Sequence, residues 1–261
     1  MPELPDVEGF RRYFARHATG KRVRGIEVPA RDILRNTTPQ GLSRSLRGRR
    51  FESPDRHGKW LLAPAGGPTL MLHFGMTGGL KWAGDKRARD GRHRHDRMIL
   101  LLDGGELRYR NMRKLGGVWV AREESEIDEI TGELGPDAQD LARDEFEQLL
   151  SGRRGGLKAA LMNQRLLAGI GNELSDEILW HARLDPSRPV SSLDDGERKA
   201  LHRDMQRVIR ESNRRGHIPR KRSWISSQRG RRDPSCPRCR GEVRRSRIAG
   251  RTAYWCPRCQ G

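Results

Sequence analysis

The chain has 261 residues, which is enough for one large or two medium domains. Its 53 Lys and Arg residues outnumber its 34 Asp and Glu residues, and the formal net charge of +19 favours a polyanionic partner, most simply nucleic acid. No apolar run approaches the roughly 18 residues of a membrane span, and acidic residues stand where a signal peptide carries basic ones. We therefore expect a soluble cytosolic protein that binds nucleic acid; a ribosome-associated or merely highly charged protein is the alternative.

The first half of the chain is predicted to form one helix followed by short strands. Pro5 suits a first helical turn, apolar residues recur at helical spacing from Val7 to Phe14, and Gly20 ends the helix. Many short β-rich runs without alternating helices favour a β-sandwich or a barrel. The predicted strands are 23–28, 59–63, 69–74, 98–103, 106–110 and 117–121.

The second half is predicted to be helical until it reaches a basic, cysteine-containing end. Residues 122–147 contain 11 acidic and 2 basic residues, together with glycines and a proline that indicate a domain boundary, so we expect a solvated linker that DNA avoids. Residues 214–251 contain 14 basic and 2 acidic residues, which favours a separate role in binding. The predicted helices are 144–150, 157–163, 172–181 and 192–212.

All four cysteines lie near the end of the chain in two Cys-x-x-Cys pairs. The pairs are Cys236 with Cys239 and, after 16 intervening residues, Cys256 with Cys259. This spacing predicts a tetrahedral site for one Zn²⁺ ion, and two disulfides or free thiols are the alternative. Four thiolates leave no open coordination position, so the ion should be structural and should hold a small hairpin within residues 243–254.

A glycine turn, residues 168–172 (AGIGN), precedes one of the predicted helices. Glycine lets a backbone approach a ligand closely, and a helix N-terminus offers unpaired N–H groups to an anion. Gly171 and Asn172 are therefore candidates for contacting a DNA phosphate. A helix–helix turn without a ligand is the alternative.

Pro2 and Glu3 are candidate catalytic residues. If Met1 is removed, Pro2 carries a free secondary amine, and an α-amino group with a pKa of about 7.7–8.0 is partly neutral and nucleophilic near pH 7. Such an amine can attack an aldehyde-like carbon, and a carboxylate one residue away can move protons. The alternative is that Pro2 and Pro5 only order the start of the first helix.

Together these motifs resemble the formamidopyrimidine-DNA glycosylase/endonuclease VIII (Fpg/Nei) family. The matching motifs, which run from residue 2 to residue 260, are PELPDVE at 2–8, GKWL at 58–61, HFGMTG at 73–78, RKLG at 113–116, LGPD at 134–137, GIGN at 169–172 with Asp176 and Glu177, and the four cysteines with Gln260. The resemblance implies an α+β multidomain fold. Its parts would be an N-terminal β-sandwich with a leading helix (1–133), a helix–two-turn–helix domain (134–222) and a four-cysteine zinc finger (223–261).

The resemblance also implies a bifunctional DNA glycosylase and AP (abasic-site) lyase of base excision repair that acts on oxidised bases. Mature Pro2 would attack C1′ of the damaged nucleotide and form a Schiff base, Glu3 would act as general acid/base at the deoxyribose, and β,δ-elimination would leave a one-nucleotide gap. Lys59 would join these two residues in catalysis by holding a phosphate near the flipped nucleotide. Asn172 and Arg251 match further phosphate-binding positions, Met76, Arg113 and Leu115 match residues that fill the space left by the base, and His73 and Gly171 are further DNA contacts.

The chain departs from the family pattern in ways that bear on the lesion. Leu115 stands where the family usually has an aromatic residue, Glu173 and Leu174 stand where it commonly has Ile and Tyr, and residues 216–236 lack the longer loop that covers 8-oxoguanine. Endonuclease VIII-like specificity for oxidised pyrimidines or cross-linked bases is therefore one alternative, and a non-catalytic protein that binds damaged DNA is another. A zinc-ribbon transcription or translation factor would leave residues 2–8 and 169–172 unexplained. We expect a monomer that binds damaged double-stranded DNA in the bacterial cytosol and nucleoid.

Overall fold

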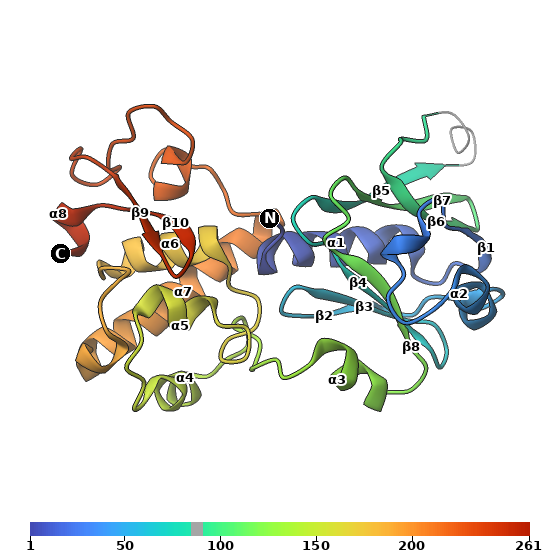
Figure 1. Ribbon diagram of the computed structural model, residues 1–261, viewed down its shortest axis with the longest axis horizontal. Coiled ribbons are helices and arrows are strands. Elements are labelled where there is room, and N and C mark those ends of the chain that lie inside the picture. Colours follow the sequence, from blue (N-terminus) through green and yellow to red (C-terminus); the bar gives the residue numbers. More distant parts are fainter. Residues whose placement is uncertain (85–90) are drawn as a thin grey trace. The chain divides into compact units, whose positions relative to one another are not determined.

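The computed structural model describes residues 1–84 and 91–261 (Figure 1). The described chain divides into two compact units. The N-terminal unit contains Met1–Pro2 and Val7–Glu133, and the C-terminal unit contains Glu3–Asp6 and Leu134–Gly261. Among the helices in the described ranges, we find none with the length and apolar character that crossing a membrane requires.

The N-terminal unit is built on two antiparallel four-stranded sheets, with the orders β1-β6-β7-β5 and β2-β3-β4-β8 (Figure 1). The strands are β1 (Val23–Glu27), β2 (Asp55–His57), β3 (Trp60–Pro64), β4 (Thr69–His73), β5 (Gly78–Gly84), β6 (Asp96–Leu102), β7 (Gly105–Asn111) and β8 (Gly117–Ala121). Each predicted strand is present, with ends that differ from the prediction by at most two residues. The sequence did not indicate β2, which is short, or β5, which contains three glycines.

Side chains from both sheets form one buried apolar cluster, which makes this unit a β-sandwich. Helix α1 (Leu4–Ala18) contributes Val7 and Phe14 to the cluster, β4 contributes Leu72 and β6 contributes Leu100. All four side chains are at most 1% exposed. Burying an apolar side chain of this size contributes about 1.5–3 kcal/mol to stability. The predicted sandwich with a leading helix is confirmed.

Two further helices of the N-terminal unit, α2 (Pro39–Leu46) and α3 (Ser125–Thr131), were not predicted. Thr38 begins α2, because its Oγ1 accepts a hydrogen bond from the N–H of Gly41 at 3.0 Å. Helix α3 buries none of its residues and lies inside the acidic stretch 122–147. The prediction that this whole stretch is a solvated linker is wrong, since it holds α3 and, further along, the fully buried Phe146.

The C-terminal unit contains helices and one two-stranded hairpin. Its elements are α4 (Arg143–Leu150), α5 (Leu157–Met162), α6 (Asn172–Ala182), α7 (Asp195–Arg215), β9 (Arg244–Ile248), β10 (Arg251–Trp255) and α8 (Pro257–Gln260). Helix α7 starts three residues later than predicted because Asp194 is its N-cap. The Asp194 carboxylate accepts from the N–H of Glu197 at 2.7 Å, and the Glu197 carboxylate accepts from the N–H of Asp194 at 3.1 Å.

Helix α6 lies in the core of this unit and is buried from Leu174 to Trp180. Its apolar side chains Leu174 and Ile178 join one cluster with Leu161 of α5 and Met205 of α7. Polar residues on the same helix are also buried, and buried polar groups need hydrogen-bond partners to be tolerated. The partners of these residues, and of the unpaired N–H groups that begin α6, define the candidate site.

Candidate active site

The Glu3 carboxylate binds the N-terminal end of helix α6. Its Oε1 accepts a hydrogen bond from the backbone N–H of Glu173 at 2.9 Å, and its Oε2 accepts from Gly171 at 3.1 Å and Leu174 at 2.9 Å. A helix N-terminus presents unpaired N–H groups and the positive end of the helix dipole. Because Glu3 is only 2% exposed, these three donors hold the carboxylate in one position.

The glycine turn leaves the space that Glu3 occupies. A Cβ atom at position 171 would lie 2.3 Å from Cδ of Glu3, and real side chains never approach this closely. Gly169 has a φ of 105°, and a Cβ there would lie 2.6 Å from Cδ1 of Leu4, whose N–H donates to the Gly169 carbonyl at 3.0 Å. Both glycines thus hold the first residues of the chain against α6. The N–H of Gly171, a predicted DNA contact, is bound to Glu3.

Pro2 directly precedes this fixed carboxylate in the chain. The N–H of Glu3 donates to Oδ2 of Asp6 at 2.8 Å, so the backbone that follows Pro2 is also held. Burial raises the pKa of Asp6, and the negative charge of Glu3 adds to this rise, although the hydrogen bond from the Glu3 N–H opposes it. The nitrogen of Pro2 and the carboxylate of Glu3 therefore belong to adjacent residues of an ordered segment.

Asn172, a predicted phosphate contact, lies against the zinc-finger hairpin. Its Nδ2 donates to the carbonyl oxygen of Thr252 in β10 at 3.0 Å. Thr252 follows Arg251, the exposed first residue of that strand and another predicted phosphate contact. The structure thus brings these two predicted residues together beside the N-terminal end of α6.

A buried ionic network fastens α6 to neighbouring elements. The carboxylate of Asp176 bonds to Nζ of Lys158 in α5, and it accepts from the Tyr254 N–H of β10 at 2.9 Å and from Arg229 at 3.0 Å. Lys158 also donates to the Asn172 carbonyl at 3.1 Å and is fully buried. Asp176 was predicted only as part of a matching motif, and Lys158 and Arg229 were not predicted at all. Their roles depend on contacts between residues far apart in the sequence.

Replacing Asp176 by asparagine is expected to lower the free energy of unfolding by about 3 kcal/mol. The change leaves the buried charge of Lys158 without its counter-ion, while Asp176 itself is only 3% exposed. Urea denaturation monitored by tryptophan fluorescence measures this effect. Asp195→Asn is the matched control, because that side chain is 83% exposed and should cost less than about 1 kcal/mol. Equal losses in both variants would contradict a stabilising role for the network.

In the N-terminal unit, three predicted DNA-binding residues gather on two adjoining loops. Nη1 of Arg113 lies 3.3 Å from Sδ of Met76, and the Arg113 N–H donates to Oγ1 of Thr77 at 3.1 Å. Met76 is 37% exposed, Leu115 is 53% exposed and Met112 is 54% exposed. Apart from Met1, they are the large apolar side chains that the described residues expose. Such side chains suit insertion into a base stack, and Met112 was missed because its sequence neighbours carry no apolar pattern.

Asn111, which is fully buried, holds these loops together. Its Oδ1 accepts from Oγ1 of Thr77 at 3.2 Å and from the N–H of Lys114 at 2.9 Å. Gly75 has a φ of 58°, and a Cβ there would lie 2.4 Å from the Gly116 nitrogen, so the two backbones can approach only because residue 75 has no side chain. The sequence marks Asn111 as a strand end but does not reveal this role.

Lys59 and His73 lie at neighbouring strand ends, since Trp60 pairs with His73 across β3 and β4. His73 Nδ1 accepts from the N–H of Gly75 at 3.3 Å. Burial lowers the pKa of His73 to about 4, and the positive charge of Lys59 contributes to this. His73 is therefore neutral at pH 7. Lys59, not His73, supplies positive charge for binding a phosphate here.

The four cysteine Sγ atoms lie within 4.8 Å of one another. The Sγ atoms of Cys236 and Cys259 are 3.9 Å apart, and those of Cys239 and Cys256 are 3.5 Å apart. Four sulfur ligands at about 2.3 Å from zinc would be separated by about 3.8 Å in a tetrahedron, so the set fits one ion. All four cysteines are free, which rules out the two-disulfide alternative. Nε1 of Trp180 donates to the Cys236 sulfur at 3.5 Å.

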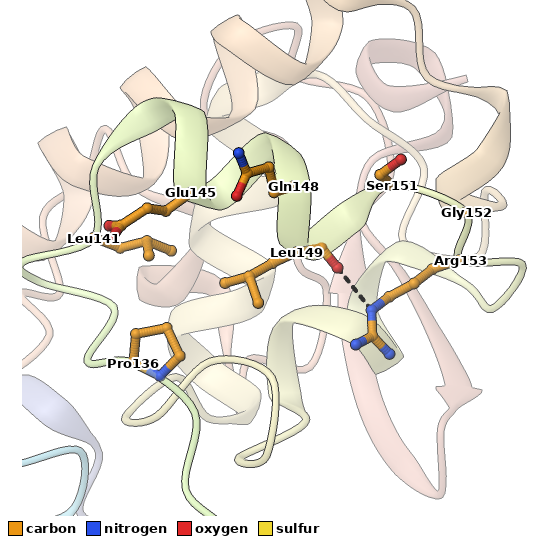
Figure 2. Close-up of a pocket in the computed structure, with 8 residues that line it drawn as sticks. All are labelled: Pro136, Leu141, Glu145, Gln148, Leu149, Ser151, Gly152 and Arg153. Carbon is orange, nitrogen blue, oxygen red and sulfur yellow. Dashed lines mark hydrogen bonds between the residues drawn. The ribbon is translucent and has the colours of Figure 1, made fainter.

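A pocket of about 520 Å³ lies beside helix α4 and contains none of the predicted site residues (Figure 2). Leu141 and Leu149 supply apolar surface, and the Nε of Arg153 donates to the Leu149 carbonyl at 2.7 Å at its rim. Glu145, Gln148 and Ser151 supply polar groups to its lining, but neither Pro2 nor Glu3 lines the pocket, so we assign it no role in their chemistry.

Three family descriptions match the chain. The formamidopyrimidine-DNA glycosylase N-terminal domain matches residues 1–118, the H2TH domain of the same family matches 134–222, and the zinc finger found in FPG and IleRS matches 235–261. Two curated relatives are the formamidopyrimidine-DNA glycosylases of Geobacter metallireducens, 35% identical over 269 residues, and Heliobacterium modesticaldum, 34% identical over 280 residues. Both alignments cover 100% of this chain and of the relative.

Solved structures of the Lactococcus lactis Fpg protein are similar over the same length. Its complex with DNA containing N7-benzyl-Fapy-dG has a TM-score of 0.88, and its non-covalent complex with DNA containing an AP site has a TM-score of 0.89. Each is 26% identical and covers 99% of both chains. The predicted sandwich, helix–two-turn–helix and zinc-hairpin fold is therefore confirmed. The full-length identity to the curated relatives shows that the chain belongs to the formamidopyrimidine-DNA glycosylase family.

Proposed function

We propose that this chain is a bifunctional DNA glycosylase and AP lyase that removes oxidised bases from double-stranded DNA in base excision repair. The observation that carries the proposal is the Glu3 carboxylate, held by three backbone N–H groups directly after Pro2. The relatives' name and the lesion-containing DNA bound by the Lactococcus protein support the same substrate class. The enzyme would act as a monomer in the bacterial cytosol and nucleoid.

Catalysis begins with the amine of Pro2 after Met1 has been removed. Its nitrogen attacks C1′ of the damaged nucleotide, the N-glycosidic bond breaks, and the base leaves with the bonding electron pair. The Pro2 nitrogen releases its proton as the sugar ring opens to a Schiff base, and Glu3 passes a proton to the ring oxygen. Loss of a C2′ proton expels the 3′ phosphate, a second elimination expels the 5′ phosphate, and hydrolysis frees Pro2.

The other site residues bind DNA around this reaction. Lys59 and Arg251 supply positive charge, and the Asn172 amide supplies hydrogen bonds, to phosphates near the extruded nucleotide. Met76, Arg113 and Leu115 fill the space that the base leaves in the stack. His73, next to Lys59, and Gly171, next to Asn172, support the DNA-binding residues beside them. These tasks fall to the three modules 1–133, 134–222 and 223–261. A zinc ion bound by the four cysteines stabilises the hairpin that carries Arg251 and takes no part in bond breaking.

The enzyme should be covalently trapped by borohydride on a duplex with an abasic site. Borohydride reduces the Schiff base between Pro2 and C1′, so the protein–DNA adduct persists on a denaturing gel. Duplexes with formamidopyrimidine, 8-oxoguanine or dihydrouracil are tested in parallel and rank the lesions, including the oxidised pyrimidines that Leu115 and the short segment 216–236 favour as an alternative.

The matched control is the same protein with an uncleaved N-terminal tag, in which the Pro2 nitrogen is an amide and no adduct should form. Mass spectrometry confirms the N-terminus of both samples. If the protein with a free Pro2 binds abasic DNA but is never trapped, the chain binds damaged DNA without catalysis, and the enzymatic proposal is wrong.

A further inference from the structure

Helix α6 places a second carboxyl group beside Glu3, and the chemistry of Pro2 and Glu3 does not use it. The backbone N–H of Glu173 donates to Oε1 of Glu3 at 2.9 Å. The Glu3 side chain is enclosed, whereas the Glu173 side chain keeps 27% of its surface exposed. Glu173 therefore binds the buried Glu3 carboxylate through its backbone, while its own side chain is partly exposed to solvent.

Four charged groups act on the Glu173 carboxyl. Nε of Arg229 lies 3.9 Å from Oε2 and Nη2 of Arg220 lies 4.0 Å from Oε1, while Glu3 and Asp6 repel its negative charge. Both distances to arginine are beyond hydrogen-bond range, so neither arginine engages a carboxyl oxygen directly. Burial raises the pKa of Glu173, with Glu3 and Asp6 adding to the rise and Arg229 and Arg220 opposing it. Glu173 thus keeps its proton to a higher pH than an ordinary glutamate.

Base excision needs a proton donor for the leaving base. When the bond between C1′ and the base nitrogen breaks, the base takes the electron pair and leaves more readily if it is protonated as it departs. The amine of Pro2 bonds to C1′, so Glu3 lies beside the sugar, and the base is attached to that same carbon. The backbone nitrogen of Glu173 lies 2.9 Å from Oε1 of Glu3, and the Glu173 side chain is partly exposed, so it is a second acid close to the group that serves the sugar.

We propose that Glu173 hydrogen-bonds to the departing base and protonates it, whereas Glu3 serves the sugar. The inference rests on the proposed function and deepens it. The carboxyl O–H of Glu173 gives its proton to a nitrogen or oxygen acceptor on the base, as the electron pair of the C1′–N bond moves to the base and Pro2 nitrogen bonds to C1′. The resulting Glu173 carboxylate is stabilised by Arg229 and Arg220, and water restores the proton before the next turnover.

With Glu173 serving the base and Glu3 the sugar, the site favours bases that carry an acceptor atom near the glycosidic nitrogen, as oxidised and ring-opened bases do. The role of Glu173 is specific to this chain, because the resemblance to the family leads one to expect isoleucine at position 173. Two carboxyl groups in contrasting environments can take separate acid–base roles in one site. Glu3 has three N–H donors, and Glu173 has none within hydrogen-bond range among the arginines beside it.

Two reactions of the same protein distinguish protonation of the leaving base from the other catalytic steps. Protonation of the leaving base accelerates excision of an intact lesion, whereas strand cleavage at a preformed abasic site involves no base. Glu173→Gln keeps the size of the side chain but cannot give up a proton. We expect its single-turnover excision rate to fall about a hundredfold, while cleavage at the abasic site stays within about twofold of the unsubstituted protein. Glu129→Gln, at an exposed position of α3, is the matched control.

The pH profile distinguishes proton donation from simple contact with the base. In the unsubstituted protein, excision should decline as Glu173 loses its proton at higher pH, and abasic-site cleavage should not share this limb. Arg220→Gln removes a positive charge 4.0 Å from the carboxyl, which raises the pKa of Glu173 and moves the limb to higher pH.

Three outcomes would overturn the inference: an unchanged excision rate in Glu173→Gln, equal losses in both reactions, or an excision limb that Arg220→Gln does not move. A failure of the unsubstituted protein to form any adduct at an abasic site would instead overturn the proposed function.

Discussion

Gly171→Ala is expected to slow base excision by about a hundredfold or more, although the change adds one methyl group. The added Cβ would lie 2.3 Å from Cδ and 2.5 Å from Oε1 of Glu3, so the carboxylate must leave the N-terminus of α6. Three hydrogen bonds hold it there, and a shift of about 1 Å in a catalytic group commonly costs this much rate. Single-turnover kinetics on the best trapped lesion measure the effect.

The matched control is Gly155→Ala in the same unit, where a Cβ meets nothing within 4 Å and the rate should change by less than about twofold. A double variant tests whether Gly171 acts through Glu3. If it does, Gly171→Ala combined with Glu3→Gln should be no slower than Glu3→Gln alone, because residues that act as a unit are not additive. A folded Gly171→Ala protein with unchanged excision would contradict the role assigned to the glycine turn.

Local sequence patterns were enough to predict some parts of the site. Two Cys-x-x-Cys pairs restrict four thiolates to one small volume, so the cluster could be predicted from spacing and the structure fits it. Pro2 and Glu3 are adjacent in the chain, so their proximity needs no fold. The acidic residues that cap α7 likewise fixed its start to within three residues.

The remaining features depend on contacts that no local pattern reports. Glu3 binds residues more than 165 positions away, and nothing at position 3 indicates which helix it meets. The glycine turn offered N–H groups to an anion, but the anion bound there is a side chain of the same chain. Asp176 and Asn111 are buried polar residues whose partners include residues distant in the sequence, Arg229 for Asp176 and Thr77 for Asn111. Glu173 departs from the family pattern, and the role proposed for it rests on contacts with residues far away in the sequence, such as Glu3.

Strand β5 and helix α2 were missed for a related reason. The three glycines of β5 disfavour a strand locally, but all seven of its residues pair with β7, and this pairing determines the structure. Helix α2 has eight residues, and its burial of Leu42 and Leu46 in the sandwich core supplies stability that its local sequence does not.

Removing zinc is expected to unfold the C-terminal hairpin and to weaken DNA binding by at least about tenfold, which corresponds to about 1.4 kcal/mol. An isolated two-stranded hairpin is marginal in water, and the small core around this one includes the cysteines Cys236 and Cys256 themselves. Structural zinc in such modules contributes about 10–16 kcal/mol of apparent binding free energy, so its loss outweighs the remaining interactions. Those interactions include the hydrogen bonds of Asn172 to Thr252 and of Tyr254 to Asp176.

A thiol-reactive mercurial added to the whole protein should release one equivalent of zinc, which a colorimetric chelator detects. DNA affinity measured by fluorescence anisotropy should fall over the same titration. The hairpin carries Arg244, Arg245, Arg247 and Arg251. For each phosphate that it no longer binds, the slope of log K against log salt concentration should become shallower by about 0.9. Cys239→Ser should reproduce the weaker binding, whereas Thr252→Ser, at an exposed position of the same hairpin, should not. Zinc release without any change in affinity or salt dependence would show that the hairpin does not bind DNA, and Arg251 would then lose its proposed role.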